Sequence, residues 1–242
     1  QFGLSADGQT AYLEMAAASG LRLLQPHERN PLQTTTFGTG ELIQAAINKG
    51  AIRIILGIGG SATTDGGIGM AAALGWRFED KSGQNLVANG AILAQIQKII
   101  PPATFPQIEI QVACDVTAPL YGPTGAAYMY APQKGADAEM VAQLDEGLKH
   151  LATIVERDFG VNLANVAGTG AAGGLGHRAA PRPAPDRGSS RRGGTGRARR
   201  RRSQRRRCGG PSGTASREDQ SRPWRTEPEA GEQMWRVGTA LA

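Results

Sequence analysis

Residues 51 to 75 read AIRIILGIGGSATTDGGIGMAAALG, a stretch in which a strand, a glycine-rich loop and a helix follow one another. The run at 51–58 is almost continuously apolar and β-branched, which is typical of a strand that is covered on both faces. After the loop, residues 67–75 have the small side chains of a helix that can pack close to that strand. Such a βα unit, repeated along the chain, predicts an α/β fold with a parallel or mixed sheet.

A second helix is predicted within residues 34–50, before this unit. Thr36 or Thr39 can cap its start, and Gly50 can end it. Its spacing predicts a buried stripe formed by Leu42, Ile43, Ala46 and Ile47.

The remaining elements predicted in the first 176 residues are again helices and strands in alternation. Residues 137–160 show the clearest helical periodicity, and their charged residues are expected to form the solvated side of that helix. Strands are predicted within 11–20, 76–86 and 108–116, with a further short strand within 125–136.

Charge divides the chain into two parts. Residues 1–176 contain 10 Lys and Arg against 15 Asp and Glu, whereas residues 177–242 contain 17 Arg, no Lys and 6 acidic residues. The second part has no Ile, Phe or Tyr, a single Leu and a single Val, so it has too few apolar side chains to offset the entropy cost of ordering. We therefore predict a domain at 1–176 followed by an anomalous, disordered or out-of-frame tail at 177–242.

Three interpretations of the Arg-rich tail remain open. GC-rich DNA translated in a shifted reading frame gives a mixture rich in Arg, Gly, Pro and Ala, which is the interpretation that the composition favours. A basic arm that binds nucleic acid would be expected to use Lys beside Arg and to interleave aromatic residues, which this tail does not do. A plain solvated linker would not contain the run RARRRRSQRRR.

Other features of the composition indicate a cytoplasmic protein. Cys114 and Cys208 lie one in each part, which argues against a disulfide framework or a multi-cysteine zinc site. No stretch approaches the length of a membrane span, and residues 1–10 lack a signal-peptide pattern. The chain begins without Met, so we expect that residues precede Gln1, and the sequence leaves a homo-oligomer open.

The glycine-rich loop of the first βα unit is the first candidate site. A turn that joins a buried strand to a helix start presents unpaired backbone N–H groups, which suit a phosphate or a carboxylate. Asp65 would repel such an anion, which points to a Mg²⁺ ligand or to a base for a substrate hydroxyl. In the alternative interpretation, Asp65 caps the helix and the glycines only satisfy the turn. The residues predicted to hold the anion are Gly59, Gly60, Ser61, Thr63 and Thr64.

Three more polar, glycine-containing loops strengthen this hypothesis. Asp115 is predicted at the carboxyl end of a strand, where α/β sheets place their ligand sites. Lys134 lies in the loop APQKGA and could provide a point charge for a phosphate. The segment AGTGAAGGLG at 167–176 is the fourth loop, and Gly173 and Gly174 are its candidate binding residues. For Asp115 and Lys134, a turn residue and an exposed loop cation remain the alternatives.

Six motifs follow one another along the first 176 residues: EMAAASGL at 14–21, TTTFGTGELI at 34–43, GIGGSATTDGG at 57–67, CDVTAPLYGPTGA at 114–126, PQKGA at 132–136 and GTGAAGGLG at 168–176. Taken together, these motifs resemble the glycerate kinase type 1 family. The resemblance implies an ATP-dependent, Mg²⁺-dependent kinase that phosphorylates D-glycerate, at the 2-hydroxyl in members of this type. It also implies site roles for Asp65, Asp115 and Lys134 as members of motifs, and Asp65 and Asp115 are the candidate Mg²⁺ ligands.

The family resemblance also implies an architecture of two α/β domains with the site between them. One domain is flavodoxin-like and built from both chain ends, and the other is an inserted mixed-sheet α/β domain that resembles a restriction-endonuclease fold. Residues 1–176 would be mostly the inserted domain. The chain departs from the family pattern in lacking DSFKGS, DGGEG-type and GEGRxD-type segments, and in having Ala118 where the family usually has Asn.

Overall fold

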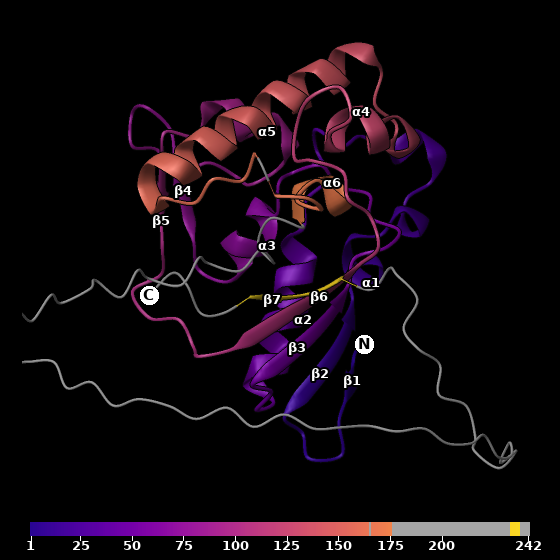
Figure 1. The fold of residues 1–242 in the computed structure, drawn as a ribbon, viewed down its shortest axis with the longest axis vertical. Helices are drawn as coiled ribbons and strands as arrows, with labels where there is room; N and C mark the ends of the chain where they lie inside the picture. Colours follow the sequence, from indigo (N-terminus) through magenta and orange to yellow (C-terminus); the bar gives the residue numbers. More distant parts are fainter. Residues whose placement is uncertain (165, 176–232, 238–242) are drawn as a thin grey trace, which may run out of the picture. The chain divides into compact units, whose positions relative to one another are not determined.

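The computed structural model describes residues 1–164, 166–175 and 233–237, and it confirms the predicted α/β class (Figure 1). Its main sheet has the strand order β1-β2-β3-β6-β7. The three inner strands run parallel, and the two edge strands are antiparallel to their neighbours, so the sheet is mixed. The strands are β1 (Gly3–Leu4), β2 (Thr10–Glu14), β3 (Arg53–Gly57), β6 (Glu109–Cys114) and β7 (Gln233–Val237).

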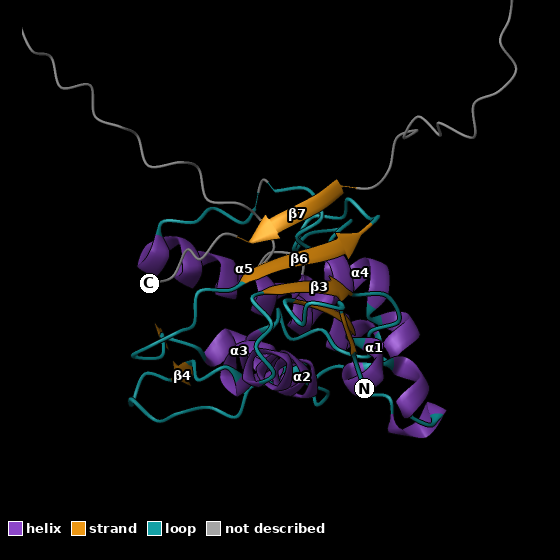
Figure 2. Ribbon diagram, turned by 90° about the horizontal axis from the view of Figure 1, so that it is seen from below, coloured by secondary structure: helices purple, strands orange, loops and turns teal. Residues whose placement is uncertain are grey.

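The parallel strands bring two predicted loops to the same end of the sheet. In Figure 2 the arrowheads of β3 and β6 point toward α4 (Ala126–Tyr130), whereas that of β7 points the other way. Leu56 of β3 lies opposite Val112 of β6, and Gly57 lies opposite Ala113. The loops that follow β3 and β6 therefore start side by side.

The βα unit that the sequence predicted is present, with one difference at its strand. β3 leads through the glycine-rich loop into α3 (Ile68–Ala73), which packs beside α2 (Phe37–Asn48). Ile54 and Leu56 are buried, but Ile55 between them is only partly covered. The expectation of a strand covered fully on both faces is therefore wrong, because the side chains of β3 alternate between a buried and a half-open face.

Of the two predicted caps of α2, the structure contains the one at its C-terminal end. Gly50 adopts a left-handed φ of 92°, and the amides of Gly50 and Ala51 donate to the carbonyl oxygens of Ile47 and Ala46, which forms the predicted C-terminal cap. Thr36 occupies the N-cap position but makes no side-chain cap hydrogen bond. The predicted capping by a Thr hydroxyl is therefore wrong, because the Thr36 hydroxyl binds elsewhere.

Residues 125–136 do not form the short strand that was predicted. Ala126–Tyr130 form the helix α4, and the 3-10 turn η4 (Pro132–Lys134) follows it. Ala126 and Ala127 are both fully buried, while Tyr128 and Met129 are exposed, which is not the alternation of a strand. The two alanines are strong helix formers, and their burial outweighs the β propensity of the aromatic residues.

The predicted long helix is confirmed as α5 (Ala138–Phe159), whose N-cap Asp137 accepts a hydrogen bond from the Met140 amide at 2.8 Å. One charged residue departs from the expected solvated side. Asp145 is buried, and its carboxylate accepts a hydrogen bond from the Gly122 amide at 2.8 Å. Burial raises the pKa of Asp145. Its hydrogen bond with the Gly122 amide holds the loop that contains Gly122 against α5.

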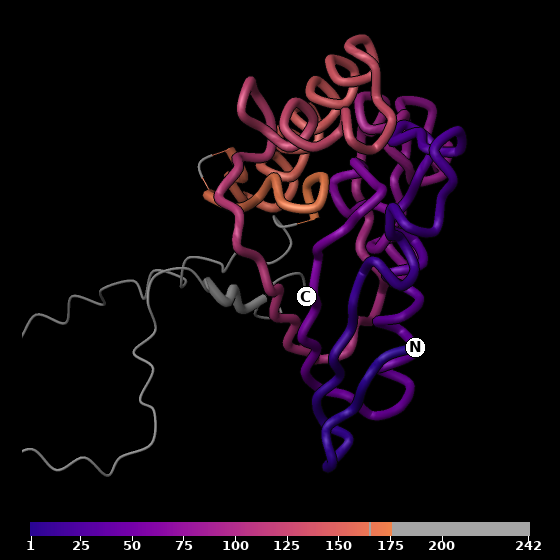
Figure 3. The backbone as a smooth tube through the Cα atoms, turned by 90° about the vertical axis from the view of Figure 1, so that its right-hand side faces the viewer, coloured from indigo at the N-terminus to yellow at the C-terminus, as the bar shows by residue number. Residues whose placement is uncertain are grey.

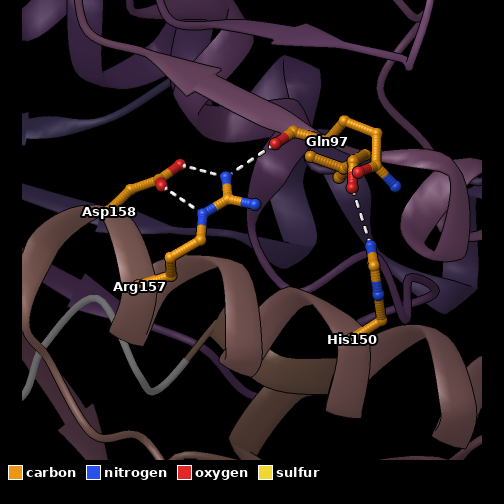
Figure 4. A network of polar contacts seen from close by, with 5 residues as sticks. Gln97, His150, Arg157 and Asp158 are labelled. Atoms are coloured by element: carbon orange, nitrogen blue, oxygen red, sulfur yellow. Dashed lines mark hydrogen bonds and ion pairs between the residues drawn. The ribbon is translucent and has the colours of Figure 1, made fainter.

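The C-terminal half of α5 is tied to the segment before β5 (Lys98–Ile100), which pairs with β4 (Arg77–Glu79) in a separate two-stranded sheet. His150 Nε2 lies 2.7 Å from the Ile96 carbonyl oxygen, and Figure 4 shows the His150 ring extending from α5 toward the segment at Gln97. Arg157 donates to the Gln97 carbonyl oxygen at 2.7 Å and pairs with Asp158. These contacts hold α5 against the segment before β5.

The remaining helical segments are short. They are α1 (Ala16–Ser19), η1 (Leu21–Leu23), η2 (Pro26–Glu28), η3 (Gly90–Gln95) and α6 (Ala171–Gly174). In Figure 3 the orange segment that contains α6 lies beside α4, in agreement with the contact between these two helices.

The predicted Arg-rich tail lies outside the described residues, apart from the five residues of β7. In the part of the chain that is described, no helix has both the length and the hydropathy needed to cross a bilayer.

Candidate functional site

A pocket of about 290 Å³ lies at the carboxyl ends of β3 and β6. Its walls come from five segments that are far apart in the sequence: the start of η1 (Leu21–Leu23), the glycine-rich loop, the end of β6 with the loop after it, the α4–η4 segment, and α6 (Ala171–Gly174). The lining residues are Leu21, Ile58, Gly59, Gly60, Ser61, Ala113, Cys114, Asp115, Val116, Tyr130, Gln133, Lys134, Ala171 and Ala172.

Three of the predicted anion-binding residues, Gly59, Gly60 and Ser61, line this pocket. Gly60 needs its lack of a side chain, because its φ is 69°. The loop is held in place by hydrogen bonds from the Leu21 amide to the Gly60 carbonyl oxygen and from the Ala62 amide to the Ser19 carbonyl oxygen, both 2.9 Å long. Gly59 and Gly60 are exposed, so their backbone is accessible to a ligand.

Thr63 and Thr64, which were predicted to hold the anion, do not line the pocket. Both are buried, with exposed fractions of 1% and 0%. Neither Oγ1 atom has a hydrogen-bond partner among the described residues. Buried hydroxyls without hydrogen-bond partners are uncommon in folded proteins.

Gly173 and Gly174 pack against the same loop. A Cβ atom at Gly173 would collide with the Thr63 carbonyl oxygen and lie 2.7 Å from the Thr64 Cα atom. The Gly66 amide also donates to the Gly173 carbonyl oxygen at 3.0 Å. These two glycines therefore allow α6 to pack closely on the glycine-rich loop and do not line the pocket, whereas Ala172, with a left-handed φ of 52°, does.

Asp65 has no exposed surface. Its Oδ2 atom accepts hydrogen bonds from the Thr36 amide at 2.8 Å, the Thr36 hydroxyl at 2.8 Å and the Gly69 amide at 3.2 Å. Its Oδ1 atom accepts one from the Gly67 amide at 3.1 Å. This arrangement is that of the capping alternative, because the carboxylate joins the starts of α2 and α3. Burial raises the pKa of Asp65, and the hydrogen bonds from Thr36 oppose that shift.

Lys134 is also buried, with 1% of its surface exposed, at the end of η4. Its Nζ atom donates to the Thr63 carbonyl oxygen at 2.6 Å. Burial lowers the pKa of Lys134 to about 7, while the charge of Asp65 acts in the opposite direction. The sequence therefore identified a residue of the pocket wall, but not the contact that its side chain makes.

Asp115 follows β6 directly, lies exposed and lines the pocket. The loop after β6 thus places this carboxylate in one pocket with Gly59, Gly60 and Lys134, as the positions of the loops predicted. Tyr130 and Gln133 line the pocket too, and sequence reasoning missed both. The motif PQKGA is the sequence signal for Gln133, but the prediction from that motif named only Lys134.

Cys114 lines the pocket as the last residue of β6. Burial raises the pKa of its thiol, and its Sγ atom lies 3.5 Å from the Val116 carbonyl oxygen. Both observations favour a protonated thiol over a nucleophile.

The donor sets of the two carboxylates test whether the site fits Mg²⁺. Asp65 fits poorly, because N–H and O–H donors already surround both of its oxygens. Asp115 fits better, because it is exposed in the pocket. Among the described residues, no cluster of three or more potential ligands forms a dedicated metal site. One carboxylate suits a Mg²⁺ ion that is otherwise held by substrate phosphates and water.

Comparison with known proteins shows where this fold and pocket belong. The model of the Glycerate kinase family matches residues 1–181. The chain belongs to the glycerate kinase family. The resemblance that the sequence motifs indicated is thereby confirmed.

Individual relatives of this glycerate kinase family member agree with the match. It is 54% identical over 178 residues to a protein from Haemophilus influenzae named glycerate kinase, covering 72% of this chain and 47% of that protein. It is 47% identical over 178 residues to the Escherichia coli protein named glycerate 2-kinase, again covering 72% and 47%. The chain spans about half the length of the curated relatives that it matches.

A solved structure supports the fold directly. The crystal structure named "putative glycerate kinase 2" from Salmonella typhimurium LT2 superposes with a TM-score of 0.69 at 46% sequence identity. The match covers 73% of this chain and 48% of that one.

Proposed function

We propose that this chain forms part of an ATP-dependent glycerate kinase that transfers a phosphoryl group to a hydroxyl of D-glycerate. The observation that carries the proposal is the pocket, in which an exposed glycine-rich backbone, the Asp115 carboxylate and the buried charge of Lys134 meet. Phosphoryl transfer depends mainly on positioning and on charge neutralisation, and these groups are suited to both. Membership of the glycerate kinase family gives the substrate class.

Each group has a distinct role in this proposal. The backbone at Gly59 and Gly60 receives the anionic part of a ligand, because both residues are exposed in the pocket and backbone N–H groups can donate to phosphate or carboxylate oxygens. Asp115 would hold the Mg²⁺ ion that accompanies ATP, and this ion would offset charge on the phosphate oxygens. Lys134, with a pKa lowered to about 7, adds positive charge within the wall of the pocket in its protonated form.

The acceptor is proposed to be the 2-hydroxyl of glycerate. Support comes from the Escherichia coli relative, which is named glycerate 2-kinase and is 47% identical over the matched region. Because the family match at residues 1–181 contains every described segment that lines the pocket, the same acceptor is the simplest expectation.

Activity measurements on the 242-residue chain test the proposal. We expect D-glycerate-dependent formation of ADP from MgATP, with 2-phosphoglycerate as the product identified by phosphorus NMR. Replacing Asp115 by Asn should lower this turnover by about 100-fold, since a carboxylate that holds the nucleotide's cation is lost. Asp80→Asn, in a solvent-accessible turn, is the matched control and should leave turnover unchanged.

Two outcomes would count against the proposal. A chain that folds but neither binds MgATP in calorimetry nor forms ADP would overturn it. Normal turnover in the Asp115→Asn variant would leave the activity intact and remove Asp115 from it. The other hypothesis from the sequence, nucleic-acid binding by the Arg-rich tail, concerns residues outside the described part, and the comparisons give it no support.

A further inference from the structure

Lys134 has an unusual environment for a charged side chain. Only 1% of its surface is exposed, and its Nζ atom donates to one backbone acceptor, the Thr63 carbonyl oxygen, at 2.6 Å. None of the ion pairs within 4.0 Å among the described residues includes Lys134. Its ammonium group therefore meets a peptide carbonyl and not a carboxylate in contact.

The Thr63 carbonyl is the point where three walls of the pocket meet. Thr63 belongs to the glycine-rich loop, Lys134 belongs to η4, and Gly173 of α6 packs so closely on Thr63 that a Cβ atom would collide with its carbonyl oxygen. A second bond, from the Gly66 amide to the Gly173 carbonyl oxygen at 3.0 Å, joins the loop to α6 beside it. Each of the three segments also contributes residues to the pocket lining, including Gly60, Gln133 and Ala172.

Retaining a lysine at this position is energetically costly. Burial lowers its pKa to about 7, which shows that the interior disfavours the charged form. An apolar side chain of similar length would fill the space without that cost. What an apolar side chain lacks is a donor for the Thr63 carbonyl oxygen, which carries the contact between η4 and the loop.

We propose that Lys134 is a positioning residue, whose hydrogen bond to the Thr63 carbonyl oxygen holds η4, the glycine-rich loop and α6 together as the walls of the ligand pocket. In this role it acts on a ligand through the loop backbone and does not donate to the ligand itself. The inference deepens the proposed function, and only its kinetic readout rests on that function.

Hydrogen–deuterium exchange of the 242-residue chain tests the contact directly. In Lys134→Met, amides of the glycine-rich loop, including the Gly66 amide, should exchange about tenfold faster, while amides of β3 and α5 keep their wild-type rates. Lys134→Gln keeps an N–H donor on a shorter neutral side chain and should restore most of the protection. Lys149→Met, at a largely exposed lysine of α5, is the matched control and should change nothing.

Kinetics separate positioning from direct ligand contact. If Lys134 positions the loop, Lys134→Met lowers turnover and raises the KM for the substrate, and Lys134→Gln recovers both. If its charge instead contacts the ligand, Lys134→Gln fails as fully as Lys134→Met and loop exchange stays at the wild-type rate, which overturns the inference. A wild-type chain without kinase activity would remove the proposed function but leave the exchange experiment decisive for Lys134.

Discussion

The Asp65 carboxylate lies in the protein interior and does not line the pocket. It has no accessible surface, and four protein donors surround its two oxygens. The Thr36 hydroxyl that donates to it also accepts a hydrogen bond from the Met70 amide at 2.7 Å, so the two residues link the starts of α2 and α3. The roles of base and metal ligand stay predictions, and the geometry favours a structural one.

Substitution of Asp65 by Asn distinguishes these roles. An amide offers one acceptor oxygen where the carboxylate offers two, and its NH₂ group would face N–H donors. We expect the free energy of unfolding to fall by about 2 kcal/mol in urea denaturation, since buried donors lose their acceptor. Asp80→Asn is the control and should leave the free energy of unfolding nearly unchanged, because water can replace the hydrogen bonds of that accessible turn. Unchanged stability with lost turnover in Asp65→Asn would restore the catalytic interpretation.

Lys134 predicts a specific pH dependence of stability. Its pKa is lowered from 10.5 to about 7, so between these pH values the unfolded chain binds more protons than the folded one. The free energy of unfolding should therefore rise with pH across this window, by about 1 kcal/mol per pH unit from this residue. Denaturation of wild type and Lys134→Met between pH 7 and 9 measures the difference. Parallel pH profiles would show that Lys134 titrates normally in the folded chain.

At the scale of elements, the crossing of α2 and α3 depends on one glycine. A Cβ atom at Gly40 would collide with the Met70 carbonyl oxygen and lie 2.6 Å from the Ala73 Cβ atom. Because backbone atoms and a short side chain cannot move aside cheaply, we expect Gly40→Ala to cost about 2 kcal/mol despite the better helix propensity of Ala. Gly3→Ala, whose Cβ would meet the Tyr12 Cβ atom at an ordinary 3.9 Å, is the control. A more stable Gly40→Ala variant would show that the helices are not so closely packed.

Elements with a strong local signal were predictable from the sequence. The periodicity of α5, the β-branched run of β3 and the Gly50 cap of α2 all depend on neighbouring residues, which is why they were found. α4 was not found, because its aromatic residues favour a strand locally and only the burial of Ala126 and Ala127 makes it a helix. The buried position of Asp145 was missed for the same reason, since its partner Gly122 lies on another segment.

For the whole molecule, stability should depend on the buried face of the central parallel strands. Ile54 of β3 is fully buried in the core, whereas Ile52 just before the strand is 56% exposed. Ile54→Ala should lower the free energy of unfolding by about 3 kcal/mol through lost burial and a residual cavity. The same change at Ile52 should stay within about 0.5 kcal/mol. Thermal denaturation of both variants makes the comparison, and equal effects would contradict the described burial.

The sequence by itself determined the α/β class, the family, and the loops that carry Gly59, Gly60, Asp115 and Lys134, because strand patterns and ordered motifs are local properties of the chain. Only the tertiary structure decided what those residues do. In the structure Asp65 is buried and accepts hydrogen bonds at the starts of α2 and α3, and Lys134 donates to the Thr63 carbonyl oxygen. Asp115, in contrast, is exposed in the pocket. The physical reason is that burial and hydrogen-bond partners come from segments distant in sequence, and no local pattern encodes them.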